Sequence, residues 1–95
     1  MIRTFTDEET EKIAVGAQSR KLPPNIQNVA RRKLRQLEAA KRLDELALPR
    51  GNRLEQLKGY APPRYSIRIN DQWRLCFRWS DGGADDVGIE DYHRG

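Results

Sequence analysis

The feature that most constrains the fold is a pair of neighbouring segments in which apolar and polar residues alternate. The apolar positions are Tyr65, Ile67 and Ile69 in the first segment and Trp73, Leu75, Phe77 and Trp79 in the second. A period of two is typical of a β-strand with one buried face. Residues 70–72 between the two segments are polar and predict a turn, so the segments are expected to form an antiparallel hairpin.

The register of this hairpin follows from burial. A three-residue turn places Ile69 opposite Trp73 and Tyr65 opposite Phe77, whereas a two-residue turn would set an apolar face beside a polar one. The first register gathers four arginines on the opposite face, namely Arg64, Arg68, Arg74 and Arg78. Such a face is either an ordinary solvated strand surface or a surface that binds phosphate through planar guanidinium groups.

The other segments complete an α+β domain, with an N-terminal strand and two helices packed on one face of an antiparallel meander. Strands are predicted at 2–5 and 86–90, an irregular strand at 53–59, and helices after Thr6 and from Pro24 to about Ala40. Thr6 and Glu9 have the spacing of a capping box.

Alignment of the last strand with its neighbour sets Arg74 beside Glu90 and Arg78 beside Asp86. A second basic surface is predicted on the helix beginning at Pro24, where Arg31, Arg32, Lys33 and Arg35 either contact RNA or are solvated.

Length and composition narrow the class of protein. The 95 residues suffice for one domain, spanning 1–95, and the net charge of +4 points weakly to a polyanionic partner. Cys76 is the only cysteine, which excludes an internal disulfide and fits a reducing compartment. No apolar stretch is long enough for a signal peptide or a membrane span. We therefore expect a soluble cytoplasmic protein with no membrane partner.

One long motif carries a family resemblance. The segment 64–79, RYSIRINDQWRLCFRW, resembles the signature of HigB-type toxins in the RelE/ParE superfamily. The similarity extends to Arg20–Pro23, to Gly51–Gly59 and to the final Asp91–Tyr92–His93, and so covers nearly the whole chain. The resemblance implies a RelE-like fold and a ribosome-dependent endoribonuclease that cuts translated mRNA in the decoding site. It also implies a cognate helix-turn-helix antitoxin of the HigA kind, with operator DNA bound only through the toxin–antitoxin complex.

Cleavage by attack of the RNA 2′-hydroxyl needs a base, an acid and cations at the phosphate. His93, which titrates near neutrality, is the first candidate for acid or base. Asp91 either orients His93, acts as the general base, or only ends the strand. Tyr92 either stacks on an RNA nucleobase, assists proton transfer, or covers the sheet edge. The expected phosphate clamps are Arg68 and Arg74, and further RNA contacts are expected from Arg53, Lys58, Arg64 and Arg78. No metal and no cofactor are expected.

The chain departs from the family pattern at Glu55, where several relatives have histidine. Glu55 is either a base itself or leaves the chemistry to His93 and Asp91. Two further hypotheses stay open at this point. The chain can be a non-enzymatic inhibitor of DNA gyrase, as ParE-type relatives are, or an inactive domain that only binds its antitoxin and DNA. The Asp91–His93 ending favours cleavage, because removing it should abolish toxicity only in a nuclease.

Overall fold

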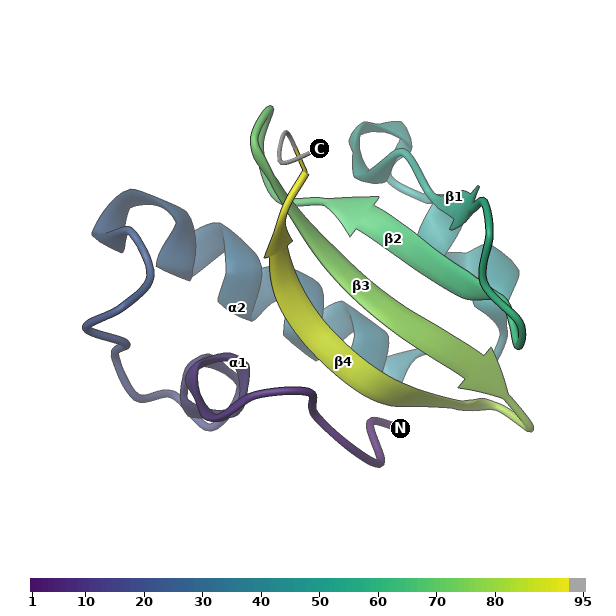
Figure 1. Cartoon of the computed structure of the whole chain (residues 1–95), viewed down its shortest axis with the longest axis horizontal. Helices are drawn as coiled ribbons and strands as arrows, with labels where there is room; N and C mark the ends of the chain where they lie inside the picture. The colour runs from purple at the N-terminus through teal and green to yellow at the C-terminus, as the bar shows by residue number, and fades with distance from the viewer. Residues whose placement is uncertain (93–95) are drawn as a thin grey trace.

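The chain folds into a four-stranded antiparallel sheet with helices on one of its faces (Figure 1). The computed structural model describes residues 1–92. The strands lie in chain order across the sheet, so the predicted α+β meander is confirmed. The elements are α1 (Glu8–Ala14), α2 (Pro24–Ala39), the short 3-10 helices η1 (Leu43–Ala47) and η2 (Arg50–Asn52), β1 (Glu55–Leu57), β2 (Arg64–Arg68), β3 (Trp73–Ser80) and β4 (Gly83–Asp91).

The hairpin of β2 and β3 has the predicted register. Tyr65 pairs with Phe77 and Ile67 pairs with Leu75, and the backbone N–H of Ile69 donates to the carbonyl of Trp73 at 2.9 Å. The turn is closed by Asn70, whose side-chain oxygen accepts the N–H groups of residues 72 and 73, each at 2.8 Å. These bonds explain why three turn residues suffice, since a short Asn side chain replaces ladder bonds that the turn lacks.

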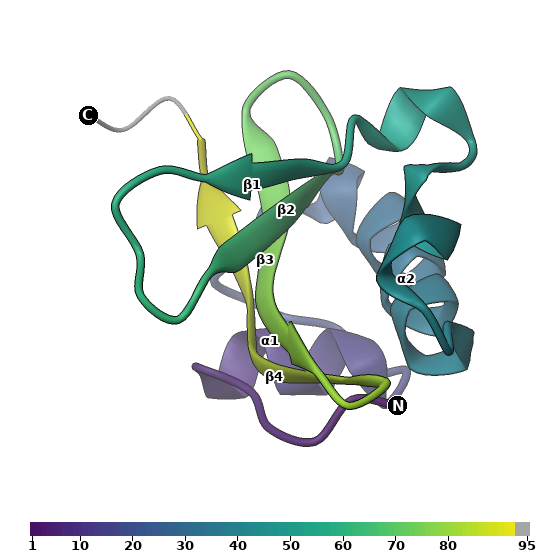
Figure 2. The same ribbon diagram turned by 90° about the vertical axis from the view of Figure 1, so that its right-hand side faces the viewer.

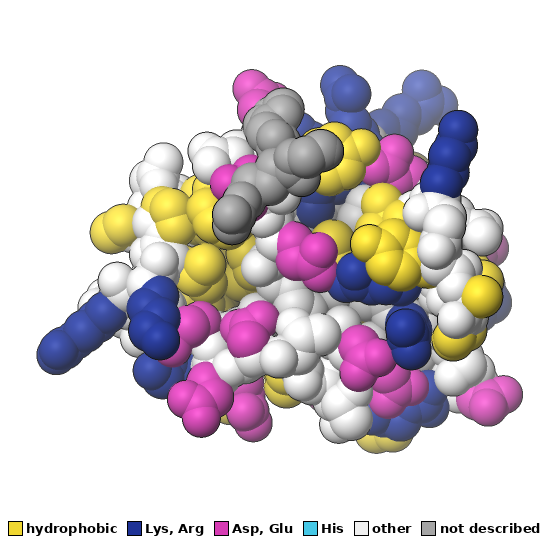
Figure 3. Space-filling model, viewed as in Figure 1, with side chains coloured by type: hydrophobic (Ala, Val, Ile, Leu, Met, Phe, Trp, Pro, Cys, Tyr) yellow, Lys and Arg dark blue, Asp and Glu magenta, His cyan; other side chains and the backbone are white. Residues whose placement is uncertain are grey.

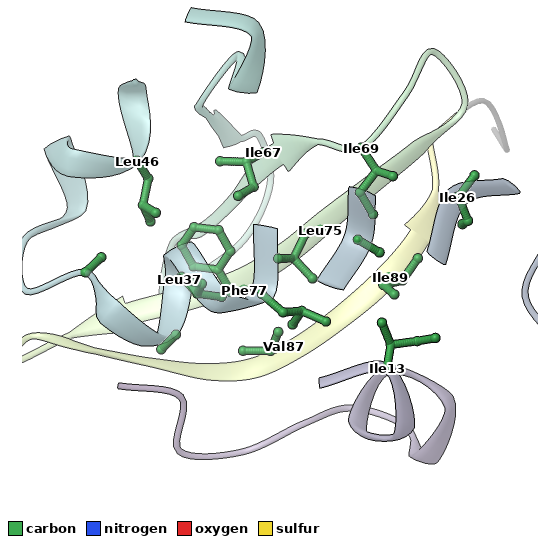
Figure 4. Packing of buried hydrophobic residues seen from close by; sticks show 14 residues of the cluster. Ile13, Ile26, Leu37, Leu46, Ile67, Ile69, Leu75, Phe77, Val87 and Ile89 are labelled. Carbon is green, nitrogen blue, oxygen red and sulfur yellow. The ribbon is translucent and has the colours of Figure 1, made fainter. Parts of the chain in front are cut away.

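Helix α2 covers the apolar face of the sheet (Figure 2). Pro24 begins the helix, as the missing N–H of proline is harmless there. Its buried apolar residues follow helical spacing and are Ile26, Ala30, Leu34 and Leu37. They form one core with sheet residues that include Ile67, Leu75, Phe77 and Val87 (Figure 4). Helix α1 packs against α2 and β4 and adds Ile13 to this core.

The prediction of an N-terminal strand is wrong. Residues 2–5 make two isolated parallel bridges to β4, Ile2 to Ala84 and Phe5 to Val87, instead of a continuous ladder. The cause is a bulge in β4, where Asp86 has a left-handed backbone with φ of 52°. The N–H of Asp86 donates to the side-chain oxygen of Thr4 at 2.8 Å, which interrupts the edge between the two bridges.

The same bulge changes one predicted neighbour on β3. Leu75 pairs with Ile89 and Arg74 pairs with Glu90 as predicted, but the pairing shifts between Cys76 and Arg78. The backbone partner of Arg78 is therefore Asp85.

The N-cap of α1 is also corrected. Asp7, and not Thr6, caps the helix by accepting the N–H of Thr10 at 2.7 Å. The hydroxyl of Thr6 instead donates to the carboxylate of Asp7 at 3.0 Å. Thr6 therefore supports the cap from outside the helix.

Candidate functional site

The four arginines of the hairpin share the face of the sheet that α2 leaves uncovered, which we call the outer face. Backbone pairing sets Arg64 opposite Arg78 and Arg68 opposite Arg74, as predicted. Each guanidinium also has an acidic partner, so acidic and basic side chains are interspersed over this face (Figure 3). The pairs are Arg64 with Glu90, Arg68 with Asp71, Arg74 with Glu55, and Arg78 with Asp86. The outer face is therefore not a uniformly basic surface.

Arg74 is held more firmly than the other three. Its residue is only 5% exposed, although it points away from the apolar core. Nε and Nη2 donate to the hydroxyl of Ser66 at 3.1 and 2.8 Å, and Nη2 also donates to the carbonyl of Arg53 at 2.6 Å. Arg53 offers that carbonyl from a left-handed backbone position directly after η2. These contacts fix one cation in a single orientation beside Glu55.

Glu55, Arg74 and Tyr92 form one cluster at the centre of the site. Glu55 is the first residue of β1 and lies against β2. Tyr92 directly follows β4 and reaches the same place. The Tyr92 hydroxyl donates to Glu55 Oε1 at 2.8 Å, and Arg74 Nη2 lies 3.6 Å from the same oxygen. The guanidinium carbon of Arg74 lies 5.0 Å from the centre of the Tyr92 ring, a cation–π contact. A carboxylate, a phenolic hydroxyl and a fixed cation thus lie in mutual contact.

The cluster raises the pKa of Tyr92. The hydrogen bond to Glu55 raises the pKa of Tyr92, and the negative charge of Glu55 raises this pKa further. Tyr92 therefore keeps its proton near neutral pH and serves as a donor. This is the protonation state that a general acid needs before reaction.

A hollow of about 240 Å³ opens beside this cluster on the outer face. Lys58 stands at its rim with an exposed side chain, and Arg74 forms part of its floor. The other lining residues are Leu57, Tyr60, Cys76, Glu90, Asp91 and Tyr92. The hollow contains a fixed arginine, an exposed lysine and two tyrosine rings. Such groups can bind a phosphate and a nucleobase.

Asp91, the last residue of β4, is among the residues that line this hollow. A regular strand would turn Asp91 towards the core, because its backbone partner is Trp73. The strand stops here, however, and the Asp91 carboxylate accepts the side-chain N–H of Gln72 at 3.0 Å. The predicted residue His93 lies outside the described residues, so its role stays a prediction.

The predicted RNA contacts occupy different surroundings. Arg64 pairs with Glu90 and lies 5.0 Å from the centre of the Tyr60 ring, while Arg78 lies 3.4 Å from Asp86. Arg68 pairs with Asp71 at the turn. The side chain of Arg53 is exposed, as is that of Lys58. Lys58 lines the hollow beside the central cluster, and Arg53 contacts Arg74 of that cluster through its backbone carbonyl.

The basic face of α2 is partly structural. Arg31 donates to the carbonyls of Ile13 and Ala17 at 3.2 and 3.0 Å and so caps the C-terminal end of α1. Lys33 donates to the side-chain oxygen of buried Asn52, and burial lowers the pKa of Lys33, with a smaller lowering from the charges of Arg32 and Arg68. Only exposed members such as Arg32 keep the predicted freedom to meet RNA.

Cys76 shares the outer face with the arginines, and burial dominates its chemistry. Desolvation raises the pKa of Cys76 to about 12, more than the nearby cations lower it. The group is therefore a neutral thiol near physiological pH, which is the inert form.

Residues 1–92 contain neither a cluster of metal ligands nor a membrane-spanning helix. No three His, Cys, Asp or Glu side chains in this part of the chain come together to hold a metal ion. None of its helices is long and apolar enough to cross a membrane.

The chain is a small α+β domain with a polar cluster on an uncovered sheet face, and comparison with known proteins gives its family. The model of the RelE-like HigB toxins of type II toxin-antitoxin systems matches residues 3–93. The chain therefore belongs to this HigB family. Toxin HigB-1 of Vibrio cholerae is 46% identical over 65 residues, which cover 68% of each chain. An uncharacterized protein of Haemophilus influenzae is 31% identical over 70 residues, covering 74% of this chain and 69% of its own. A type II toxin has a cognate antitoxin.

The residue that sequence reasoning left unassigned is Glu55. The structure places it at the centre of the cluster, in contact with both Arg74 and Tyr92. Its signals in the sequence are its position within the segment that resembles the family and the histidine that several relatives have there. Periodicity could not have found it, because β1 is three residues long.

Proposed function

We propose that the chain is a ribosome-dependent endoribonuclease that cleaves translated mRNA in the decoding site and so arrests growth. We further propose that a HigA-like helix-turn-helix antitoxin neutralises it in the cytoplasm, and that operator DNA is bound only through their complex. Membership of the HigB toxin family supports this proposal. The observation that carries it is the contact of Glu55, Arg74 and Tyr92 beside an open hollow.

These groups match the needs of RNA cleavage by the 2′-hydroxyl. A carboxylate can take the hydroxyl proton, and Glu55 and Asp91 are both close to the hollow. Arg74 can stabilise the extra negative charge that develops on the phosphate, because its orientation is fixed before substrate binds. Tyr92 can donate a proton or stack on a base. His93 is proposed as a further acid or base on the strength of the family resemblance.

The RNA strand is proposed to enter along Lys58 and Arg53, whose exposed side chains can meet phosphates. Arg64 and Arg78 lie further along the outer face and are paired with Glu90 and Asp86. RNA must compete with these carboxylates, so the two arginines should contribute less to affinity than Lys58. Exposed Arg32 on α2 is a candidate contact to ribosomal RNA.

The test is primer extension on a defined mRNA incubated with the purified protein, with and without active translation. We expect cuts only in the translating sample, and their positions give the codon preference. Cuts in neither sample, from a protein that still arrests growth, would reject the nuclease and point to a gyrase-type target. A protein that neither cuts nor arrests growth would instead be a domain that only binds its antitoxin.

The variant His93→Ala sharpens this test. It should abolish cleavage and toxicity while the domain remains folded by circular dichroism. Full activity of this variant would remove His93 from the mechanism but leave the nuclease assignment intact. The matched control is Arg42→Ala, because Arg42 is exposed and pairs with Asp44 at η1, away from the hollow.

A further inference from the structure

A hydrogen bond joins two groups that prefer opposite protonation states. Tyr92 lines the hollow and donates to Glu55 Oε1 at 2.8 Å, and both side chains are partly exposed. The carboxyl group is the stronger acid of the two types, so the proton rests on the phenol. In such a pair the carboxylate can accept a proton and the phenol can donate one. A proton can then pass from the carboxyl group to the phenolate through the hydrogen bond between them.

We propose that Glu55 and Tyr92 form a self-resetting proton relay for RNA cleavage. Glu55 accepts the proton of the attacking 2′-hydroxyl, and Tyr92 donates a proton to the departing 5′ oxygen. The hydrogen bond between them then returns the proton from Glu55 to Tyr92. This inference rests on the proposed function and assigns the acid and the base within it.

The reaction balances without a co-reactant. The 2′ oxygen bonds to phosphorus while its proton passes to the Glu55 carboxylate. The bond from phosphorus to the 5′ oxygen breaks while that oxygen takes the Tyr92 hydroxyl proton. The products are a 2′,3′-cyclic phosphate and a 5′-hydroxyl, with Glu55 protonated and Tyr92 a phenolate. Proton transfer from the carboxyl group to the phenolate is downhill and restores the starting site.

The surroundings of the pair support this role. Arg74 lies 3.6 Å from Glu55 Oε1 and 5.0 Å from the centre of the Tyr92 ring, so one fixed cation faces both members. It stabilises a negative charge on either group, and the charge moves from Glu55 to Tyr92 during the step. The other titratable groups that line the hollow are Lys58, Tyr60, Cys76, Glu90 and Asp91.

A purely structural interpretation has to be separated from the relay. Glu55 could serve only to anchor the Tyr92 ring over Arg74, in which case both groups would matter for position and neither for proton transfer. The two interpretations differ in their response to the leaving group. A sulfur leaving atom departs without a proton, so it removes the need for an acid and leaves the need for a base.

The experiment compares two mRNAs in programmed, translating ribosomes. One has the ordinary 5′ oxygen at the cut position located by primer extension, and the other has sulfur in its place. Tyr92→Phe should cut the ordinary RNA about 10²- to 10⁴-fold more slowly than the wild type and regain most of the rate on the sulfur RNA. Glu55→Gln should be slowed about as much on both RNAs, because it lacks the base.

Matched controls and pH dependence complete the test. Tyr65→Phe and Glu8→Gln should cut both RNAs at the wild-type rate, since Tyr65 packs against the core and Glu8 is exposed on α1. Glu55→His replaces a carboxyl group by an imidazole, whose ordinary pKa is about two units higher. This variant should therefore retain cleavage, with the acid limb of its pH–rate profile moved towards neutral pH.

Three results would overturn the relay. The first is a Tyr92→Phe variant that sulfur does not rescue, and the second is a Glu55→Gln variant that sulfur does rescue. The third is rescue of His93→Ala in place of Tyr92→Phe, which would make His93 the acid. In each of these cases the wild type still cuts RNA, so the proposed function survives. A wild-type protein that cuts neither RNA would overturn the proposed function and the relay together.

Discussion

The two faces of the β2–β3 hairpin differ in what holds their side chains. On the apolar face, Ile67, Leu75 and Phe77 are fully buried and pack in the layer that α2 closes. On the outer face, each of four arginines pairs with one carboxylate, and these carboxylates come from different parts of the chain. Glu55 belongs to β1, Asp71 to the turn, and Asp86 and Glu90 to β4. One face is a layer of equivalent contacts, and the other is a set of individual pairs.

On the outer face, the surroundings of each arginine determine whether it is fixed or free to move. Arg68 and Arg74 are backbone partners on the same face, yet the Arg74 side chain is 6% exposed and that of Arg68 is 33% exposed. Ser66 and the carbonyl of Arg53 fix the first, whereas the second meets a carboxylate that is 94% exposed. Catalysis needs an oriented cation, so Arg74 and Arg68 should have different roles.

The largest effect on stability is expected on the apolar face. Leu75→Ala should lower the free energy of unfolding by about 2–5 kcal/mol, because it removes buried methylene groups and leaves a cavity. Urea denaturation followed by circular dichroism measures this change. The neighbouring variant Cys76→Ala on the outer face is the control and should cost clearly less. Equal losses from the two variants would contradict the division of the hairpin into two unlike faces.

The sequence allowed most of the apolar face to be predicted, and for a physical reason. Burial is not directional, so alternation alone determines which residues face the core and which register is possible. The N-terminal strand was predicted wrongly, because the left-handed backbone of Asp86 leaves no trace in the periodicity of residues 2–5.

The candidate site could be predicted only in part. Arg74 was found because it lies in the motif 64–79 that carries the resemblance, and Tyr92 because it lies in the Asp91–His93 ending to which the resemblance extends. The role of Glu55 could not be assigned, because it depends on a hydrogen bond to a residue 37 positions away. Pairing between distant polar groups needs the tertiary structure, whereas an apolar stripe does not.

An intermediate effect on stability, with a large effect on activity, is expected at Arg74. Arg74→Lys keeps the charge but loses the planar fork that bonds Ser66 and Arg53 at once. It should cost about 1–3 kcal/mol of unfolding free energy, since buried acceptors lose their donors. Cleavage by the folded variant, measured by primer extension, should fall well below the wild type.

The control for this prediction is Arg78→Lys, at a position whose side chain is 40% exposed and pairs with Asp86. It should change both stability and cleavage little. If Arg74→Lys and Arg78→Lys behave alike, the fixed orientation of Arg74 has no functional meaning.

The smallest effect on stability is expected at Arg68. Arg68→Gln removes an exposed ion pair with Asp71, which should change the unfolding free energy by less than about 1 kcal/mol. Its effect on RNA should be electrostatic: affinity for programmed ribosomes falls, and the slope of log affinity against log salt becomes shallower by about one phosphate contact. Filter binding across a salt series measures that slope.

An unchanged slope with normal folding would show that Asp71 keeps Arg68 occupied in the complex, and RNA binding would then depend on Lys58 and Arg53. Unfolding of the variant would make Arg68 a structural residue, and the contrast with Arg74 would disappear.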